Sequence, residues 1–152
     1  MKRILIIDHQ PLIREALRLA VRSVWNQASI IEASCHADAE RAGRSSAAVD
    51  LVIIDPALPD VEGLESLVIL RKTLPLTPIV VFSSSRDPQV AAASYILGAS
   101  AHMPKSAMMS EITKTLRRAA SGERVLVAPK TPCASIDKLK TAHKRLETLS
   151  PA

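Results

Sequence analysis

The sequence predicts a doubly wound α/β fold, in which five parallel strands are covered by helices on both faces. Three observations predict it. Short apolar runs alternate with helical patterns five times between residues 1 and 122. Several of these runs are apolar at every position, as expected of strands buried on both faces. The 152 residues, 47% hydrophobic and 23% charged, have the length and composition of one globular core.

The first half of the pattern contains two strands and two helices. Arg3 to Asp8 is an apolar run that predicts the first strand, and Ser29 to Ala33 predicts the second. A helix is expected to begin at Pro11, because its apolar residues recur at helical spacing: Ile13, Leu17, Ala20, Val21 and Val24. A polar, alanine-rich helix is expected from Ala37 to Ser45.

The second half continues the alternation. Leu51 to Ile54 is rich in β-branched residues and ends on Asp55, which predicts a strand, and a helix is expected from Gly63 until Pro75. The remaining elements are strands at Ile79 to Phe82 and Ala101 to Met103, and helices at Val90 to Leu97, with Gly98 as C-cap, and at Ser106 to Ala120.

Residues 123–152 differ from the rest and predict an appendage. Arg124 to Ala134 contains two prolines and is expected to be extended, whereas Ile136 to Leu149 has helical periodicity. The leucine face of that helix is expected either to pack within the chain or to form a dimer surface. The segment is basic, which suits either contact with a phosphate backbone or an ordinary solvated surface.

Composition excludes several classes of protein. The apolar runs are far shorter than the about 20 residues of a membrane-spanning helix, and the N-terminus lacks a secretory signal, so a cytoplasmic protein is expected. Cys35 and Cys133 have neither metal-ligand spacing nor a disulfide pattern. One Trp, one Tyr and one Phe leave no platform for stacking nucleic-acid bases. With only four glycines, the sequence has no glycine-rich phosphate loop, which makes a flavodoxin-like enzyme a weak hypothesis.

Polar residues follow four of the five predicted strands. Asp8 and His9 follow the first strand, Asp55 the third, Ser83 the fourth, and Lys105 lies just beyond the fifth. Because ligands bind beyond the carboxyl ends of strands in an open parallel sheet, these side chains are expected at one edge. Carboxylates, a hydroxyl and an amine together suit a phosphoryl group.

The residues around these positions resemble the response-regulator receiver domain of two-component signalling, in particular its NarL/LuxR-type subfamily. The resemblance covers about residues 3–122 and rests on four motifs in order: Ile4-Leu-Ile-Ile-Asp8-His9-Gln-Pro11, Asp55-Pro-Ala-Leu-Pro59 followed by Gly63, Ser83, and Met103-Pro104-Lys105. It implies a CheY-like, flavodoxin-like fold and a signalling module rather than an enzyme.

The resemblance also implies a mechanism. Asp55 would accept a phosphoryl group from a sensor histidine kinase, with Ser83 and Lys105 contacting the phosphoryl oxygens. Mg²⁺ would be held by Asp8, Asp55 and the backbone carbonyl of Ala57. A rearrangement of Ser83 and of His102, which stands at the family's aromatic switch position, would transmit the phosphorylation state to the rest of the domain.

Two residues depart from the family pattern. His9 stands where the family has the second acid of a pair, and imidazole is a poor ligand for Mg²⁺, so weakened Mg²⁺ binding is expected. Asp60 and Glu62 cannot be assigned as substitutes from the sequence. His102 stands where the family has an aromatic relay residue. His36 is expected to be a surface residue.

Two hypotheses about function follow. The first is a receiver (residues 1–122) that controls a transcription regulator, with residues 123–152 as linker. The end of the chain, Leu149-Ser-Pro151, is similar to the opening of a LuxR-type helix-turn-helix domain, so DNA binding is expected only through a C-terminal domain absent from this chain. A homodimer is expected. The second hypothesis, favoured by His9 and His102, is a phosphorylation-independent pseudo-receiver that binds a protein partner or a ligand.

Overall fold

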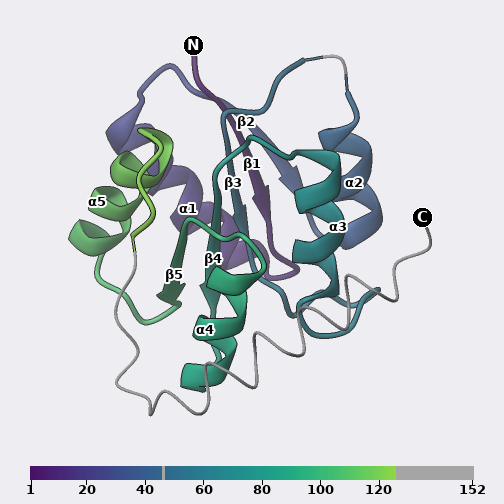
Figure 1. The fold of residues 1–152 in the computed structure, drawn as a ribbon. Coiled ribbons are helices and arrows are strands. Elements are labelled where there is room, and N and C mark those ends of the chain that lie inside the picture. The colour runs from purple at the N-terminus through teal and green to yellow at the C-terminus, as the bar shows by residue number, and fades with distance from the viewer. Residues whose placement is uncertain (46, 126–152) are drawn as a thin grey trace.

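The computed structural model describes residues 1–45 and 47–125, which form a five-stranded, fully parallel sheet with five helices (Figure 1). The strand order is β2-β1-β3-β4-β5, so the predicted doubly wound α/β fold is confirmed. The strands are β1 (Arg3–Ile7), β2 (Ser29–Ala33), β3 (Leu51–Ile54), β4 (Ile79–Ser83) and β5 (Ala101–Pro104). The helices are α1 (Pro11–Val24), α2 (His36–Gly43), α3 (Glu65–Thr73), α4 (Pro88–Ile96) and α5 (Met109–Ala120).

The sheet separates two apolar cores. Helices α1 and α5 lie on one face of the sheet, and α2 and α3 lie on the other (Figure 1). Along β1, Ile4 and Ile6 pack with α1 and α5, whereas Leu5 and Ile7 face the opposite core. All four side chains are fully buried, and each contributes about 1.5–3 kcal/mol on burial. The uninterrupted apolar runs therefore supply both cores at once.

Some helix boundaries differ from the sequence prediction because local capping decides them. Helix α3 begins at Glu65 and not at Gly63, since Gly63 has a φ of 51°, in the left-handed region. Helix α4 begins two residues before Val90, because Asp87 caps it: the Asp87 carboxylate accepts a hydrogen bond from the backbone N–H of Gln89 at 2.9 Å. Gly98, with a φ of 101°, follows the end of α4 as predicted.

Helices α2 and α5 also differ at their ends. Helix α2 spans His36–Gly43, where Ala37 to Ser45 was predicted, and α5 begins at Met109, where Ser106 was predicted. The residue before α5, Met108, has extended backbone angles, so the helix cannot begin earlier.

Most of the predicted appendage lies outside the described residues. The predicted extended segment is described only as far as Val125, whose N–H donates to the Ser100 carbonyl at 2.6 Å and which forms a bridge with Ala101. The predicted helix from Ile136 to Leu149 lies outside the described range.

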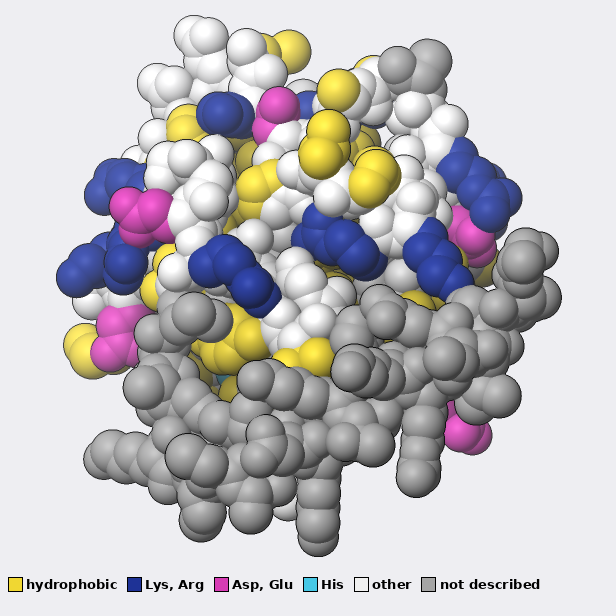
Figure 2. Space-filling model, in the orientation of Figure 1, with side chains coloured by type: hydrophobic (Ala, Val, Ile, Leu, Met, Phe, Trp, Pro, Cys, Tyr) yellow, Lys and Arg dark blue, Asp and Glu magenta, His cyan; other side chains and the backbone are white. Residues whose placement is uncertain are grey.

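The surface seen in Figure 2 mixes charge types. Over the described residues of this face, Lys and Arg side chains are interspersed with acidic and apolar ones (Figure 2). A nucleic-acid site usually gathers basic residues into one stripe. The described part of this face therefore has the character of an ordinary solvated surface (Figure 2). Separately, none of the helices in residues 1–45 and 47–125 combines the length and apolar character needed to cross a membrane.

Arg71 at the end of α3 joins two parts of the chain that follow it. Its guanidinium donates to the carbonyls of Leu74 (3.2 Å), Pro75 (3.1 Å), Thr77 (2.9 Å) and Gly98 (2.9 Å). Burial, with a smaller contribution from the charge of Arg124, lowers the pKa of Arg71. The guanidinium thus satisfies carbonyl oxygens in the α3–β4 loop and at the end of α4 that no helix or strand satisfies.

Replacing Arg71 with Met is expected to reduce the free energy of unfolding by about 2 kcal/mol, because several hydrogen-bonded carbonyls lose a charged donor. Urea unfolding at neutral pH measures this change. The matched control is Arg41→Met: Arg41 lies on α2 with an exposed ion pair, and its loss should change stability by less than about 0.5 kcal/mol. Equal effects of the two substitutions would contradict the role given to Arg71.

Candidate functional site

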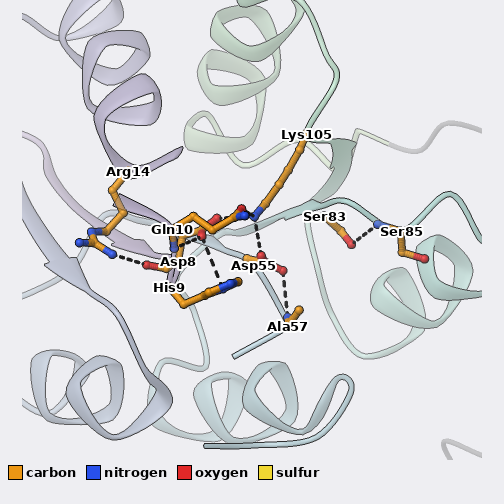
Figure 3. Close-up of polar contacts among 9 residues, drawn as sticks. All are labelled: Asp8, His9, Gln10, Arg14, Asp55, Ala57, Ser83, Ser85 and Lys105. Carbon is orange, nitrogen blue, oxygen red and sulfur yellow. Dashed lines mark hydrogen bonds and ion pairs between the residues drawn. The ribbon is translucent and has the colours of Figure 1, made fainter. Parts of the chain in front are cut away.

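The carboxyl ends of the strands bring the predicted polar residues to one edge of the sheet (Figure 3). Backbone hydrogen bonds hold these residues in register beyond the strands. The N–H of Asp8 donates to Ala33, the N–H of Asp55 donates to Ile7 at 2.9 Å, and the N–H of Lys105 donates to the Ser83 carbonyl at 2.9 Å. The positions of Asp8, Asp55 and Lys105 are therefore fixed by the sheet and do not depend on long loops.

Lys105 is the cation between two buried carboxylates. Its Nζ donates to Asp55 Oδ2 at 2.6 Å and to Gln10 Oε1 at 2.7 Å, and it lies 2.8 Å from Asp8 Oδ2. Asp8 and Asp55 are 0% and 2% exposed. Two carboxylates buried side by side repel each other, so the ammonium group offsets a large unfavourable interaction.

The protonation state of Lys105 follows from these contacts. Burial lowers the pKa of Lys105, but the contacts with Asp55 and Asp8 outweigh it, so that the pKa is raised above its ordinary 10.5. Lys105 is therefore charged at neutral pH. This stabilising contribution is complete below pH 10.5 and is lost only as the pH rises through the raised value.

His9 approaches the same carboxylates from the other side. In Figure 3 its ring extends toward Asp55 from beside Asp8, opposite Lys105. His9 Nδ1 lies 3.9 Å from Asp8 Oδ1, and the side chain is 46% exposed. Donor atoms of Asp8, His9 and Asp55 all lie within 4.8 Å of one another, and these residues form an acidic pocket.

The contacts of Asp8 bear on whether this pocket fits a metal ion. Asp8 Oδ1 accepts a hydrogen bond from the N–H of Gln10 at 2.8 Å, and the buried Asp8 Oδ2 is paired with the ammonium group of Lys105 at 2.8 Å. Each oxygen thus has one donor and keeps a further lone pair. A buried carboxylate oxygen with free acceptor capacity suits a divalent cation. The carboxylates therefore fit Mg²⁺, but the imidazole of His9 does not suit it.

Ser83 and Ala57 flank Asp55. Ser83 is the last residue of β4 and is buried, whereas the predicted strand ended one residue earlier, at Phe82. Its Oγ accepts a hydrogen bond from the N–H of Ser85 at 3.1 Å, which leaves the hydroxyl proton for a further acceptor. The N–H of Ala57 donates to Asp55 Oδ1 at 2.9 Å. Both oxygens of Asp55 thus have a donor.

His102 lies in the middle of β5, paired in register with Val81. Its neighbours Ala101 and Met103 pack in the core with α1 and α5, so the His102 side chain faces the other side of the sheet. The ring is partly buried, its Nε2 accepts or donates no hydrogen bond, and burial lowers the pKa of His102. The imidazole is therefore neutral at pH 7.

Two residues at this edge were missed by the sequence analysis. Gln10 uses its backbone N–H on Asp8 and its side-chain oxygen on Lys105. Arg14 on α1 donates to the Asp8 carbonyl at 2.6 Å and forms an ion pair with Glu32 at 3.3 Å. No sequence signal marks Gln10, because its role depends on where its side chain happens to meet a lysine 95 positions later.

His36 is buried, so the prediction of a surface position was wrong. Its Nδ1 lies 2.6 Å from the Oγ of Ser66 on α3, and its Nε2 lies 3.5 Å from Glu40. The backbone N–H groups of His36 (2.8 Å) and Ala37 (3.0 Å) donate to the Asp60 carboxylate. Asp60 therefore caps α2 from the loop that follows Asp55, and it is not part of the acidic pocket.

Comparison with known proteins identifies the family. Residues 4–117 match the model of the response regulator receiver domain. The chain belongs to this family. Among the relatives of this receiver are the response regulator UvrY of Escherichia coli, 26% identical over 144 residues (93% of this chain, 66% of the relative), and the nitrate/nitrite response regulator protein NarL of Escherichia coli, 29% identical over 129 residues (85% and 59%).

Solved structures share the receiver fold. A LuxR-family two-component response regulator from Aurantimonas has a TM-score of 0.71 at 24% identity, covering 95% of this chain and 97% of that one. The fold class is thus confirmed, and the similarity to NarL confirms the resemblance to NarL-type regulators. The receiver spans only 59% to 66% of the length of the two curated relatives.

Replacing Lys105 with Met is expected to lower the free energy of unfolding by on the order of 3 kcal/mol at pH 7, because two buried carboxylates lose their shared cation. Adding Asp8→Asn to this variant should restore most of the loss, since one charge is then removed. Urea unfolding of the single and double variants measures both effects. Lys114→Met on the exposed face of α5 is the control. An equal loss in the control would argue against the pairing.

Replacing Asp60 with Asn is expected to destabilise the receiver at neutral pH. Hydrogen bonds from the His36 and Ala37 N–H groups lower the pKa of Asp60 below its ordinary 3.8. Because the pKa of Asp60 is lower in the folded chain than in the unfolded chain, the ionised carboxylate stabilises the folded state above pH 3.8. This stabilisation disappears as the pH falls through the pKa of Asp60 in the folded state. The difference in urea midpoint between the parent and the variant should therefore be present at pH 7 and shrink below pH 3.8. A difference independent of pH would rule out the charge as its cause.

Proposed function

We propose that this receiver accepts a phosphoryl group on Asp55 from the phosphohistidine of a sensor histidine kinase, and so controls a DNA-binding transcription regulator. The observation that carries the proposal is the contact of Lys105 Nζ with Asp55 (2.6 Å) and Asp8 (2.8 Å) at the carboxyl edge of the sheet. This contact gives the acceptor carboxylate a fixed position and a neighbouring positive charge.

The transfer itself needs a nucleophile and charge compensation. A carboxylate oxygen of Asp55 attacks phosphorus, the bond between phosphorus and the donor nitrogen breaks, and the electron pair of that bond returns to the donor imidazole. Lys105 then pairs with an oxygen of the bound phosphoryl group in place of Asp55 Oδ2. The Ser83 hydroxyl proton is available to a second phosphoryl oxygen.

A divalent cation would be held by Asp8, by Asp55 and by the backbone carbonyl of Ala57. When bound, Mg²⁺ supplies positive charge that offsets the repulsion between the anionic carboxylate and the anionic phosphoryl group. His9 in place of a second acid is expected to weaken Mg²⁺ binding, because the pocket loses one negative charge and one oxygen ligand.

Ser83 and His102 are the proposed switch residues. When Ser83 donates to a phosphoryl oxygen, the end of β4 shifts toward Asp55, and the unpaired neutral ring of His102 on the adjacent strand β5 can change position without breaking a hydrogen bond. The readout is proposed to be a change in self-association of a homodimer or in the docking of an output domain.

The remaining parts of the proposal concern partners. DNA binding is assigned to a C-terminal domain outside these 152 residues, joined through the linker at 123–152. The proposed location is cytoplasmic, as expected from the sequence. The proposed reaction places one phosphoryl group on the domain's own Asp55, so the domain is proposed to be a signalling module and not an enzyme. The meeting of Asp55, Ser83 and Lys105 at one edge favours this phospho-switch over a pseudo-receiver, which would not need that arrangement.

Intact mass after incubation with acetyl phosphate tests the proposal. With Mg²⁺ or Mn²⁺ present, we expect one phosphoryl adduct on the 152-residue chain and none on Asp55→Asn. Asp38→Asn, which removes an exposed carboxylate on α2, is the matched control and should still form the adduct.

Two results would overturn the proposal. One is a folded chain that forms no adduct at any concentration of either metal, which would favour the pseudo-receiver. The other is an adduct that persists in Asp55→Asn, which would place the acceptor elsewhere.

A further inference from the structure

The acidic pocket carries less negative charge than a site made of three acids. Asp8 and Asp55 supply two negative charges, and Lys105 within 2.8 Å of both returns one positive charge. His9 completes the donor cluster without adding negative charge. Any dication that depends only on charge attraction to oxygen ligands, as Mg²⁺ does, is therefore held less tightly here.

The third donor changes which cations are favoured. Imidazole nitrogen is a borderline ligand that binds well to Zn²⁺ and its first-row neighbours, whereas carboxylate and water suit Mg²⁺. Imidazole nitrogen and carboxylate oxygen are both ligands that proteins use for Zn²⁺. A histidine at position 9, in place of the family's acid, thus lowers the affinity for Mg²⁺ and raises the affinity for Zn²⁺ and its first-row neighbours.

The geometry allows one ion to bridge the donors. In tetrahedral geometry, bonds of about 2.0–2.2 Å from a zinc ion place two ligand atoms about 3.3–3.6 Å apart. His9 Nδ1 and Asp8 Oδ1 lie 3.9 Å apart, and the ligand atoms of Asp8, His9 and Asp55 all lie within 4.8 Å of one another, so small side-chain movements bring them to that spacing. The His9 side chain is 46% exposed, so its ring can turn by small amounts and water can complete the coordination shell.

The buried side of the pocket is occupied by Lys105. Asp8 is fully buried, and its Oδ2 is paired with Lys105 Nζ at 2.8 Å, while its Oδ1 is the oxygen nearer to His9, at 3.9 Å. Lys105 and His9 lie on opposite sides of the carboxylates (Figure 3). A cation held by His9 would therefore approach from the exposed side without displacing Lys105 from Asp55.

We propose that this pocket selects a borderline first-row dication, with Zn²⁺ as the representative, over Mg²⁺, and that His9 is a direct ligand through an imidazole nitrogen. The proposal deepens the proposed function and rests on it, because it concerns the cation that accompanies phosphoryl transfer at the same edge. It assigns to His9 a specificity-determining role where the family pattern has an acid.

Calorimetric titration of the 152-residue chain with Zn²⁺ and, separately, with Mg²⁺ tests this assignment. The chain carries Cys35→Ser and Cys133→Ser, so that thiolates do not bind Zn²⁺. His9→Asn is expected to weaken Zn²⁺ binding about tenfold or more, and His9→Asp to lower the preference for Zn²⁺ over Mg²⁺ about tenfold or more. The ring ¹⁵N resonances of His9 should shift on addition of Zn²⁺.

His143→Asn is the matched control, since it removes one histidine but keeps Asp8, His9 and Asp55, and it should leave both affinities unchanged. The proposal fails if His9→Asn binds Zn²⁺ as tightly as the parent, or if His9→Asp has the same preference between the two metals. These titrations contain no phosphoryl donor. A missing phosphoryl adduct on Asp55 would therefore count against the proposed function, while the titrations would still decide the metal preference.

Discussion

The ion pairing of Lys105 with Asp8 and Asp55 is the interaction on which the functional edge depends. Parallel strands bring the two carboxylates into a buried position at the same end of the sheet, and like charges so placed are unfavourable without a cation. Lys105 supplies it from the loop after β5, the strand at the edge of the sheet. The pairing thus joins the central strands to the outermost one, and any anion that binds beside Asp55 must compete with the two carboxylates for the same ammonium group.

Much of the fold could be predicted because the sheet is buried on both sides. Continuous, β-branched apolar runs such as Leu51 to Ile54, alternating with helical patterns, favour strands that are buried on both faces, and the polar residue at the end of each run marks the edge where ligands bind. The positions of Asp8, Asp55, Ser83 and Lys105 followed from this rule alone. Their roles in chemistry came from a resemblance, and they remain proposals.

What could not be predicted depends on contacts between distant segments. Nothing local distinguishes Asp60 from a solvated loop residue, yet it caps α2, more than 20 residues earlier. His36 lies in a polar, alanine-rich segment that suggested exposure, but the neighbouring helix places Ser66 against its ring. The predicted starts of α3 and α4 were wrong for a related reason. The left-handed backbone of Gly63 decides where α3 begins and the Asp87 cap decides where α4 begins, and the spacing of apolar residues reveals neither.

The cap that Asp60 places on α2 has a consequence for motion. The loop between β3 and α3 begins at Asp55, and two backbone N–H groups of α2 hold it at Asp60, so any closure of the loop over the edge of the sheet is coupled to α2. Any displacement large enough to break these hydrogen bonds also frees the first turn of α2. The loop and the first turn of α2 therefore move together. Opening of the loop requires at least the free energy needed to break the two hydrogen bonds that cap α2.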